Sequence, residues 1–477
     1  MFSPEREPHP SVAEIKFLQQ PAQIRPRDAE NFATLRVTKA KSPLLSLLEG
    51  EVAAPIALKV TNRYVFRDLT HVSWKWRLSC SRSRDPILLG EAANVSMLSS
   101  LDLSPAIKKV RQLESSQKEG SLLNYFLDIQ GVMNCDQTWA SAGHIVVVEQ
   151  IPLRIVFEND QPAPPKSIKL DDTRDDTLVV TSDQDSIKVS NGGNSPFVAI
   201  DKLSGGISSI KHSNTELLCG HGLKSNFTRA ATDNDRGGLE LILDFMLLSW
   251  AEPLVHLQGN DNFSYEKHWK RYGLSQDSPP RLDDCSVDVV EAEDDHVRIE
   301  AYASVRTTSG KVIFNILTEY EIFRDRRIFL SVSVRPTASI RKIPTLPRIG
   351  LSFDLNPSFH KIQYSGRGPH ENYPDRKVGA KQGIWKTSPS EMGYSYIVPS
   401  ENGSRSDCKW ISFDSDDGGM VVVADACNSF SCSALLHSAE ELHHAQHTCD
   451  LDPRKNGVHP IHVNIDHQLL GVGGDVR

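Results

Sequence analysis

The chain has 477 residues, of which 39% are hydrophobic and 24% are charged, and its formal net charge is −8. This length indicates about three domains, and this composition is typical of a globular protein with sizeable cores. The negative charge argues against a general nucleic-acid binder, which needs a basic face, and no apolar run approaches the roughly 20 residues that cross a bilayer.

Residues 1–12 are polar and rich in proline, and we expect them to form a disordered lead. They have no apolar core of the kind that a secretory signal needs. The eight cysteines lack paired spacing. In a chain without a signal this usage indicates free, mostly buried thiols and a cytoplasmic protein.

Residues 13–158 show the period-two alternation of short strands. Strands are predicted at Ile15 and Phe17, at Leu35 and Val37, and over residues 57–62, 72–78 and 144–149. Little helix is expected, so the prediction is an immunoglobulin-like β-sandwich. Residues 41–55 are rich in Leu and Ala and interrupt the strand series, so we expect a poorly ordered insertion there.

Residues 159–178 have the proline-rich, acidic composition of a linker. Residues 179–477 then form a second all-β region, with strands predicted over residues 187–190, 197–201, 297–300, 312–323, 328–334 and 349–355. Because no helical pattern separates these strands, we expect one large sandwich of long strands.

The segment Gly368–Arg376 combines two prolines with carboxylates, an amide, an imidazole, a phenol and a guanidinium. Such a segment predicts a fixed loop that contacts something. Retaining glycosidases need two carboxylates about 5 Å apart. Glu371, Asp375 and Glu401 are carboxylates of this region, but loop carboxylates more often cap turns or pair with arginine. We therefore expect no catalytic role for them.

Two further groups have the residue types of metal ligands. Asp233 and Asp235 have the spacing of a calcium loop, but a glycine follows where another ligand is needed, which favours a simple turn. The second group is a cluster of histidines beside Cys449, in which His443 and His447 would share a face only within a helix. The sequence therefore favours the interpretation that these histidines lie on the solvated surface and bind no metal. The clustered histidines are His437, His443, His444 and His447.

Several segments resemble, in order, the last two domains of the β-galactosidases of glycoside hydrolase family 2. These segments are residues 14–21, 60–66, 227–235, 366–376, 399–403 and 465–475. The resemblance implies an immunoglobulin-like β-sandwich followed by a galactose-mutarotase-like β-supersandwich, without a TIM barrel. It also implies a set of carbohydrate-binding or barrel-facing residues. They are Arg229, Asp233, Asn234, Asp235, His370, Glu371, Asn372, Tyr373, Asp375, Arg376, Glu401 and Asn402.

In that family the catalytic carboxylates and the magnesium ligands lie on a barrel that precedes these domains. The resemblance therefore implies no catalytic residue, metal ligand or cofactor in this chain, whereas Mg and Na belong to the complete enzyme. The implied partners are a barrel-containing chain or upstream segment, a galactoside bound by the complete enzyme, and a second copy of the chain. No nucleic-acid or membrane partner is expected.

The chain departs from the family in two places. Residues 238–270 look like an apolar insertion, and the sequence stops at Asp475–Arg477 before an aromatic residue of the family. We expect a C-terminally truncated supersandwich with an open edge. Two alternatives stay open at this point. One is a stand-alone carbohydrate-binding module that uses Tyr373, Trp385 and Tyr394, and the other is a non-functional truncated product.

Overall fold

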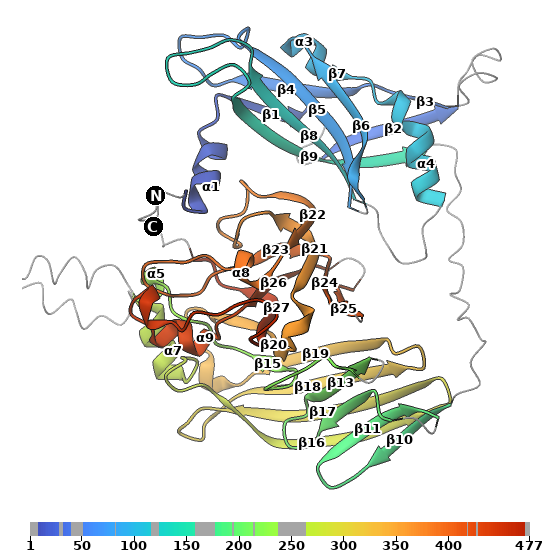
Figure 1. Cartoon of the computed structure of the whole chain (residues 1–477), viewed down its shortest axis with the longest axis vertical. Coiled ribbons are helices and arrows are strands. Elements are labelled where there is room, and N and C mark those ends of the chain that lie inside the picture. Colours follow the sequence, from blue (N-terminus) through green and yellow to red (C-terminus); the bar gives the residue numbers. More distant parts are fainter. Residues whose placement is uncertain are drawn as a thin grey trace, which may run out of the picture.

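The computed structural model describes residues 8–27, 32–39, 51–81, 83–115, 124–157, 177–192, 195–212, 215–236, 264–416, 418–425 and 428–472. Figure 1 shows two bodies of β-sheet, the N-terminal one in blue to teal and the C-terminal one in green to red. Within these ranges the sheets form sandwich-like layers and none closes into a barrel. The predicted all-β class is confirmed. No helix in the described part of the chain is long and apolar enough to cross a membrane.

The described residues of the N-terminal module form two sheets and a few short helices. Its elements are α1 (Ser11–Leu18), β1 (Ala22–Pro26), β2 (Ala33–Lys39), β3 (Glu51–Ala53), β4 (Ile56–Asn62), β5 (Val72–Cys80), β6 (Ser83–Ala92), α3 (Val95–Leu98), β7 (Ser100–Leu101), the 3-10 helix η1 (Ser104–Ala106), α4 (Ile107–Ser115), β8 (Tyr125–Met133) and β9 (Ile145–Phe157). A 3-stranded sheet of order β1-β4-β7 faces a 6-stranded sheet of order β3-β2-β9-β8-β5-β6. The pairing of β2 with β9 is parallel.

Apolar alternation specifies this sandwich, as β5 illustrates. Val72, Trp74 and Leu78 are fully buried in the core between the sheets, and Trp76 on the same face packs against that core. Their polar neighbours point to the other face, because successive side chains of a strand alternate. The predicted strands at residues 35–37, 57–62, 72–78 and 144–149 are confirmed in β2, β4, β5 and β9.

The predicted strand at Ile15 and Phe17 is wrong. Both residues lie in helix α1, none of whose residues is buried, so their alternation reflects no sheet face. The helix is anchored instead by Glu14, whose carboxylate accepts hydrogen bonds from the backbone of the C-terminal module. The disordered lead is also wrong for Ser11 and Val12, which form the first turn of α1, while residues 1–7 lie outside the described residues.

Two other expectations concern segments that lie mostly outside the described residues. Of the predicted insertion, residues 41–50 are not described, but Glu51–Ala53 forms strand β3 and pairs with β2, so poor order is wrong for that part. Of the predicted linker, residues 159–176 are not described, and Leu178 already begins a strand.

The C-terminal module is larger. Its elements are β10 (Leu178–Ser182), β11 (Ser186–Asn191), β12 (Val198–Asp201), β13 (Ile207–His212), β14 (Thr215–Glu216), β15 (Lys224–Asn226), α5 (Asp233–Arg236), α7 (Tyr265–Tyr272), β16 (Arg281–Ala292), β17 (His296–Arg306), β18 (Val312–Phe323), β19 (Ile328–Pro336), η4 (Ala338–Ile340), β20 (Arg348–Leu355), η5 (Pro357–Phe359), β21 (Lys361–Gly368), β22 (Lys381–Thr387), α8 (Pro389–Met392), β23 (Arg405–Cys408), β24 (Trp410–Asp414), β25 (Gly419–Val423), β26 (Phe430–Leu435), α9 (Ala439–His444), η6 (Thr448–Asp450) and β27 (Ile461–Leu469).

In the part of this module that the structure describes, four sheets share the cores. Their strand orders are β10-β11-β12-β13-β14, β16-β17-β18-β19, β15-β20-β27-β26-β23 and β22-β21-β24-β25. One continuous core takes buried residues from all four sheets. The six strands predicted here are confirmed in β11, β12, β17, β18, β19 and β20. The expected absence of helices is wrong, because α5, α7 and α9 gather at one end of the module (Figure 1).

The two modules meet at the segment that follows the Gly368–Arg376 loop. The Gln150 side chain donates to the Gln382 carbonyl at 2.8 Å and accepts from its N–H at 2.7 Å, as a neighbouring strand would. Glu14 of α1 accepts from the N–H of Gly379 at 2.6 Å. A side chain at Gly379 would collide with the backbone of Ala13, so this contact requires glycine. The predicted loop therefore leads directly into the docking segment.

Candidate functional site

Half of the predicted site residues converge on one buried polar group, which we call the signature cluster. It joins the loop before α5, the Gly368–Arg376 loop, the loop before β23, and strands β20 and β27. Its members are Arg229, Asp235, Arg348, Glu371, Tyr373, Arg376, Glu401 and Asp466, and all but Arg376 are buried. Because charges are costly to bury, each must find a partner inside the cluster.

Arg229 ties the first loop to the chain segment after β27. Its Nη2 donates to both carboxylate oxygens of Asp235, at 2.7 and 2.8 Å. The same guanidinium donates to the carbonyls of Leu470 and Gly471. Its face lies 5.4 Å from the centre of the Trp269 ring on α7. Asp235 is therefore fully engaged by arginine inside helix α5, which leaves it no role as a calcium ligand.

Two other predicted residues, Asn234 and Asp375, bind the two backbone polar groups of Val472. Asn234 Nδ2 donates to the Val472 carbonyl at 2.6 Å, and the Val472 N–H donates to Asp375 Oδ1 at 3.3 Å. A side chain at Gly471 would collide with the Asp375 carboxylate, so the segment passes closely over the loop. Asp233, in contrast, is exposed. Residues 470–472 are therefore the segment that Arg229, Asn234 and Asp375 bind through its backbone.

Arg348 is the buried centre of the cluster. Its Nη2 donates to Glu401 Oε1 at 3.0 Å, and its Nη1 donates to Asn464 Oδ1 at 3.0 Å. Its Nε lies 2.9 Å from Asp466 Oδ1, as an ion pair in which neither atom makes a well-directed hydrogen bond. Burial raises the pKa of Asp466 to about 7, against the opposing effect of Arg348. One guanidinium thus compensates two buried carboxyl groups.

The Gly368–Arg376 loop uses its polar side chains to fix itself. Glu371 accepts from Arg376 Nη2 at 2.6 Å, from the Gly403 N–H at 2.8 Å and from the Tyr396 hydroxyl. Asn372 Nδ2 donates to the carbonyls of Arg367 and His370, both at 3.0 Å, and its Oδ1 accepts from the Ser406 N–H at 2.9 Å. Both oxygens of Glu371 are therefore engaged by donors of the protein itself, and the side chain is buried.

Two other residues of this loop are also enclosed, Tyr373 fully and His370 in part. Tyr373 is 0% exposed, and its hydroxyl has no hydrogen-bond partner among the described residues. A sugar platform that includes Tyr373 is therefore ruled out. Burial lowers the pKa of His370 to about 4, so its imidazole is neutral at physiological pH. Buried Asn402 donates to the Ser400 carbonyl at 2.8 Å and accepts from the Tyr394 N–H at 3.1 Å.

Sequence reasoning missed two members of the cluster, Arg348 and Asp466, and the neighbouring ring of Trp269. Arg348 opens a strand whose other residues are mostly apolar, which is a weak signal of a buried charge. Asp466 stands in the segment 465–475 that carries the family resemblance, and it was available from that motif. Trp269 lies in the predicted apolar insertion, where Ser264 caps α7 by accepting from the Lys267 N–H.

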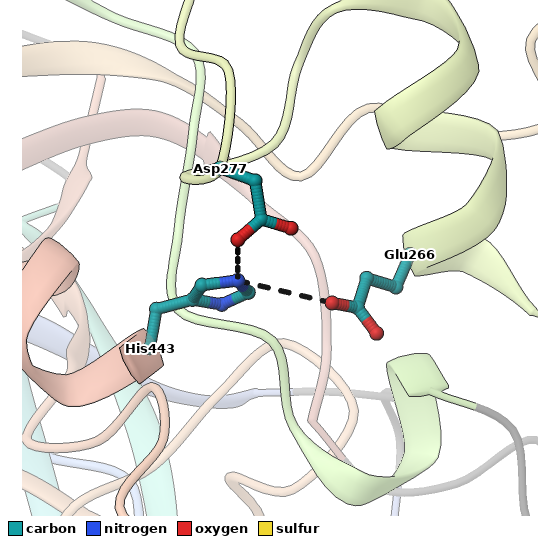
Figure 2. Close-up of side chains that lie close together, drawn as sticks. All are labelled: Glu266, Asp277 and His443. Atoms are coloured by element: carbon teal, nitrogen blue, oxygen red, sulfur yellow. Dashed lines mark hydrogen bonds and ion pairs between the residues drawn. The ribbon is translucent and has the colours of Figure 1, made fainter. Parts of the chain in front are cut away.

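A second polar group lies beside the cluster, between α7 and α9. Figure 2 shows the His443 imidazole pointing between the carboxylates of Asp277 and Glu266. His443 Nε2 lies 3.3 Å from Asp277 Oδ1 and 3.8 Å from Glu266 Oε1. Of the clustered histidines, His443 and His444 belong to helix α9, whereas His447 lies beyond its end. The helical face that His443 and His447 would need is therefore absent.

The hydrogen bonds of His443 oppose a metal at this position. Its Nδ1 accepts from the Ala231 N–H at 3.3 Å, so the proton of the neutral ring is on Nε2 and points at Asp277. A ring nitrogen that carries a proton cannot ligate a metal. In addition, Lys270 Nζ lies 3.0 Å from both Glu266 and Asp277 and already neutralises them. We interpret this group as a structural link between α7, α9 and the loop before α5.

Family models match most of the chain. Residues 192–476 match the model described as "Beta galactosidase small chain", and residues 58–154 match "Beta-galactosidase, domain 4". The boundary between these matches agrees with the boundary between the two modules.

Curated relatives give the same result. The chain is 29% identical over 362 residues to the β-galactosidase of Priestia megaterium, covering 75% of this chain and 30% of that protein. It is 27% identical over 476 residues to the β-galactosidase of Pseudoalteromonas haloplanktis, covering 100% of this chain and 39% of that protein. The Vibrio cholerae β-galactosidase is 26% identical, with 100% and 38% covered. The chain thus spans between about a third and two fifths of these relatives. On the family matches and on the clustering of the signature residues, the chain belongs to the β-galactosidase small-chain family and represents the C-terminal domains of the family 2 β-galactosidases.

Proposed function

We propose that this chain is a non-catalytic portion of a β-galactosidase that supports a catalytic barrel. The barrel would be supplied by a separate chain or by residues that precede these domains in a longer product. The substrate would be a terminal β-galactoside, bound and cleaved by the complete enzyme. The proposal is supported by the β-galactosidase relatives, of which this chain matches 30 to 39%.

The observation that carries the non-catalytic assignment is that buried signature carboxylates are engaged by donors of the protein itself. A general acid or nucleophile must reach the substrate within hydrogen-bond distance. Glu371 instead bonds Arg376, Tyr396 and Gly403, and both oxygens of Asp235 bond Arg229. Glu401 is buried against Arg348. These groups hold the loops and residues 470–472 in place, which suits a rim that positions a neighbouring barrel.

Mg and Na would be bound by the barrel portion of the complete enzyme. The described residues offer two groups with the spacing of metal ligands, and neither suits magnesium, which prefers several oxygen ligands and retains waters. The first is the Glu266, Asp277 and His443 group, in which Lys270 and the histidine proton occupy the ligand positions. The second consists of Glu291, Glu293 and His296 near a surface hairpin, with Asp295 bonded to the histidine ring at 3.0 Å. We therefore assign no cofactor to this chain.

A complementation assay tests the proposal. The purified chain would be assayed on a chromogenic β-galactoside alone, and then with the barrel-containing portion of the Pseudoalteromonas relative. We expect no turnover by the chain alone, and turnover with comigration in gel filtration when both are present. Robust hydrolysis by the chain alone would overturn the non-catalytic assignment, and absence of both association and turnover would count against the supporting role.

A matched pair of variants adds a structural control. Asn234→Ala removes an exposed side chain that holds Val472, and it should lower the complemented activity without unfolding the chain. Arg298→Met breaks surface ion pairs on the β16–β19 sheet and should leave that activity unchanged. Equal effects of the two variants would show that the segment 470–472 has no part in the rim.

A further inference from the structure

Two buried cysteines from adjacent strands lie in contact beside the signature cluster. Cys408 ends β23, Cys432 lies in β26, and both are 0% exposed. Their sulfur atoms are 3.5 Å apart. Both residues are free thiols in this structure. The sulfurs would need to approach by only about 1.5 Å to reach disulfide bonding distance.

A bulge in β23 creates this contact. Arg405 lies opposite Cys432, but Cys408 lies opposite Phe430, so β23 carries one extra residue between these pairs. The bulge includes Asp407, whose φ of 54° is in the left-handed region. Without the extra residue, Cys408 would point away from the face that Cys432 occupies, because strand side chains alternate. With it, both thiols face the same core.

The surroundings of the bulge hold this geometry. Asp407 is bonded to Arg367 at 2.5 Å and to Lys377 at 2.9 Å, which compensates the strained backbone locally. On the neighbouring strand β21, a side chain at Gly366 would collide with the Cys408 sulfur, so the glycine leaves the space that this thiol fills. The pair is therefore a defined feature of the fold and not a chance approach of flexible side chains.

We infer that Cys408 and Cys432 form a redox-convertible site that closes to an internal disulfide. The oxidant is a low-molecular-weight disulfide such as glutathione disulfide. One cysteine thiolate attacks a sulfur of this disulfide and releases one glutathione thiolate, which gives a mixed disulfide. The second cysteine thiolate attacks the protein sulfur of that mixed disulfide and releases the second glutathione. Two cysteine thiols are oxidised, one small disulfide is reduced, and the two thiol protons end on glutathione.

Burial determines when this conversion can occur. It raises the pKa of Cys408 well above the ordinary value, and the neighbouring Cys432 adds to this, so the closed native site contains little thiolate. The reaction therefore proceeds when the edge strand β23 opens, or during folding, and not on the closed structure. In the cytoplasm predicted from the sequence the pair stays a dithiol, and an oxidising environment converts it.

The disulfide would fasten an edge strand that carries part of the signature cluster's support. Among the described residues, β23 is the terminal strand of its sheet and pairs there with β26 alone. Ser406 in β23 donates its N–H to Asn372, and Arg405 donates to the Tyr364 hydroxyl at 3.0 Å. A covalent link from β23 to β26 would limit opening of this strand and so stabilise the loop that Asn372 organises.

The test is to refold the full chain with a glutathione redox couple, block remaining thiols by alkylation, and map the peptides by mass spectrometry. We expect a mass lower by two hydrogen atoms, a linked Cys408–Cys432 peptide, a higher melting temperature than the dithiol form, and reversal by dithiothreitol. Alkylation of both cysteines after oxidising refolding would overturn the inference. So would a link from either cysteine to Cys427, which lies outside the described residues.

Variants separate the pair from the other thiols. Cys432→Ala should abolish both the linked peptide and the oxidant-dependent rise in melting temperature. Cys135→Ala removes an exposed thiol of the N-terminal module and should leave both readouts unchanged. If Cys432→Ala fails to fold, the peptide map of the unmodified chain still decides the question. An oxidant-dependent rise that persists in Cys432→Ala would contradict the assignment.

Discussion

Arg348 and Glu401, 53 positions apart in the chain, form a buried ion pair of 3.0 Å. The charge of each side chain compensates that of the other. Asp466 forms a second ion pair with the same Arg348 guanidinium. Buried pairs of this kind add little net stability compared with apolar packing, but the loss of one partner leaves an uncompensated charge. The ion pair therefore links strand β20 to the loop before β23.

Replacement of Arg348 by methionine should destabilise the C-terminal module strongly. The change leaves Glu401 and Asp466 buried without a cation, and such a loss costs roughly 3–5 kcal/mol. The measurement is the free energy of unfolding from urea titration followed by circular dichroism. Arg298→Met is the control, because its pairs with Glu300 and Glu319 are part-exposed and worth at most about 1 kcal/mol. Similar losses in both variants would contradict the buried-cluster interpretation.

Tyr373→Phe should be neutral or slightly stabilising. The variant removes a buried hydroxyl that has no partner among the described residues, and its ring stays in place. Tyr364→Phe is the matched comparison, because its buried hydroxyl accepts from Arg405 Nε at 3.0 Å. That change should cost about 1–3 kcal/mol, since a charged donor loses its acceptor. Thermal melts of the two variants decide the point, and a larger loss for Tyr373→Phe would reverse our assignment.

Glu149→Gln should alter the pH dependence of stability. Glu149 and Lys381 line a cavity of about 150 Å³ between the modules, and burial raises the pKa of Glu149 from 4.5 to about 7. Between those two pH values the native state retains a proton that the unfolded state has lost. This contribution to stability is full below pH 4.5 and is lost as the pH rises through 7.

The glutamine variant should therefore exceed the parent in stability by about 1–2 kcal/mol at about pH 8, and the advantage should vanish in acid. This is less than the full pKa difference implies, because Glu149 is only part-buried. Urea titrations across this pH range provide the measurement. Glu91→Gln, at an exposed position of the same module, should show no such crossover. A pH-independent difference for Glu149→Gln would refute the explanation.

Zinc should not stabilise the chain through His443. The variant His443→Ala should lower the stability of the chain whether or not zinc is present. The alanine variant leaves the Ala231 N–H without its acceptor, at a cost of about 1–3 kcal/mol. Melting temperatures with and without zinc test both statements. His444→Ala, at a more exposed position of the same helix, should have little effect. A saturable rise with zinc that His443→Ala abolishes would instead establish a metal site.

The sequence predicted the strands well where one face of a sheet is buried. The strand predicted over residues 312–323 has those same bounds in β18, because one of its faces carries an apolar residue at nearly every second position from Val312 to Ile322. The same rule failed for Ile15 and Phe17, since alternation indicates a strand only when one face is buried, and α1 buries none of its residues. Its position depends on Glu14 meeting the backbone of residues 378 and 379, which no local pattern encodes.

By itself the sequence determined the all-β class, most strand positions, the family, and the residues that form the signature loops. Those properties depend on local alternation and on motifs, which are present in the linear order of residues. Only the tertiary structure decided what the signature residues do. Arg229 meets Leu470 across 241 positions, and Arg348 meets Asn464 across 116. Burial and charge compensation arise only when such distant segments meet. Two of the three carboxylates that suggested chemistry, Glu371 and Glu401, are structural partners of arginine, and the third, Asp375, accepts from the Val472 N–H.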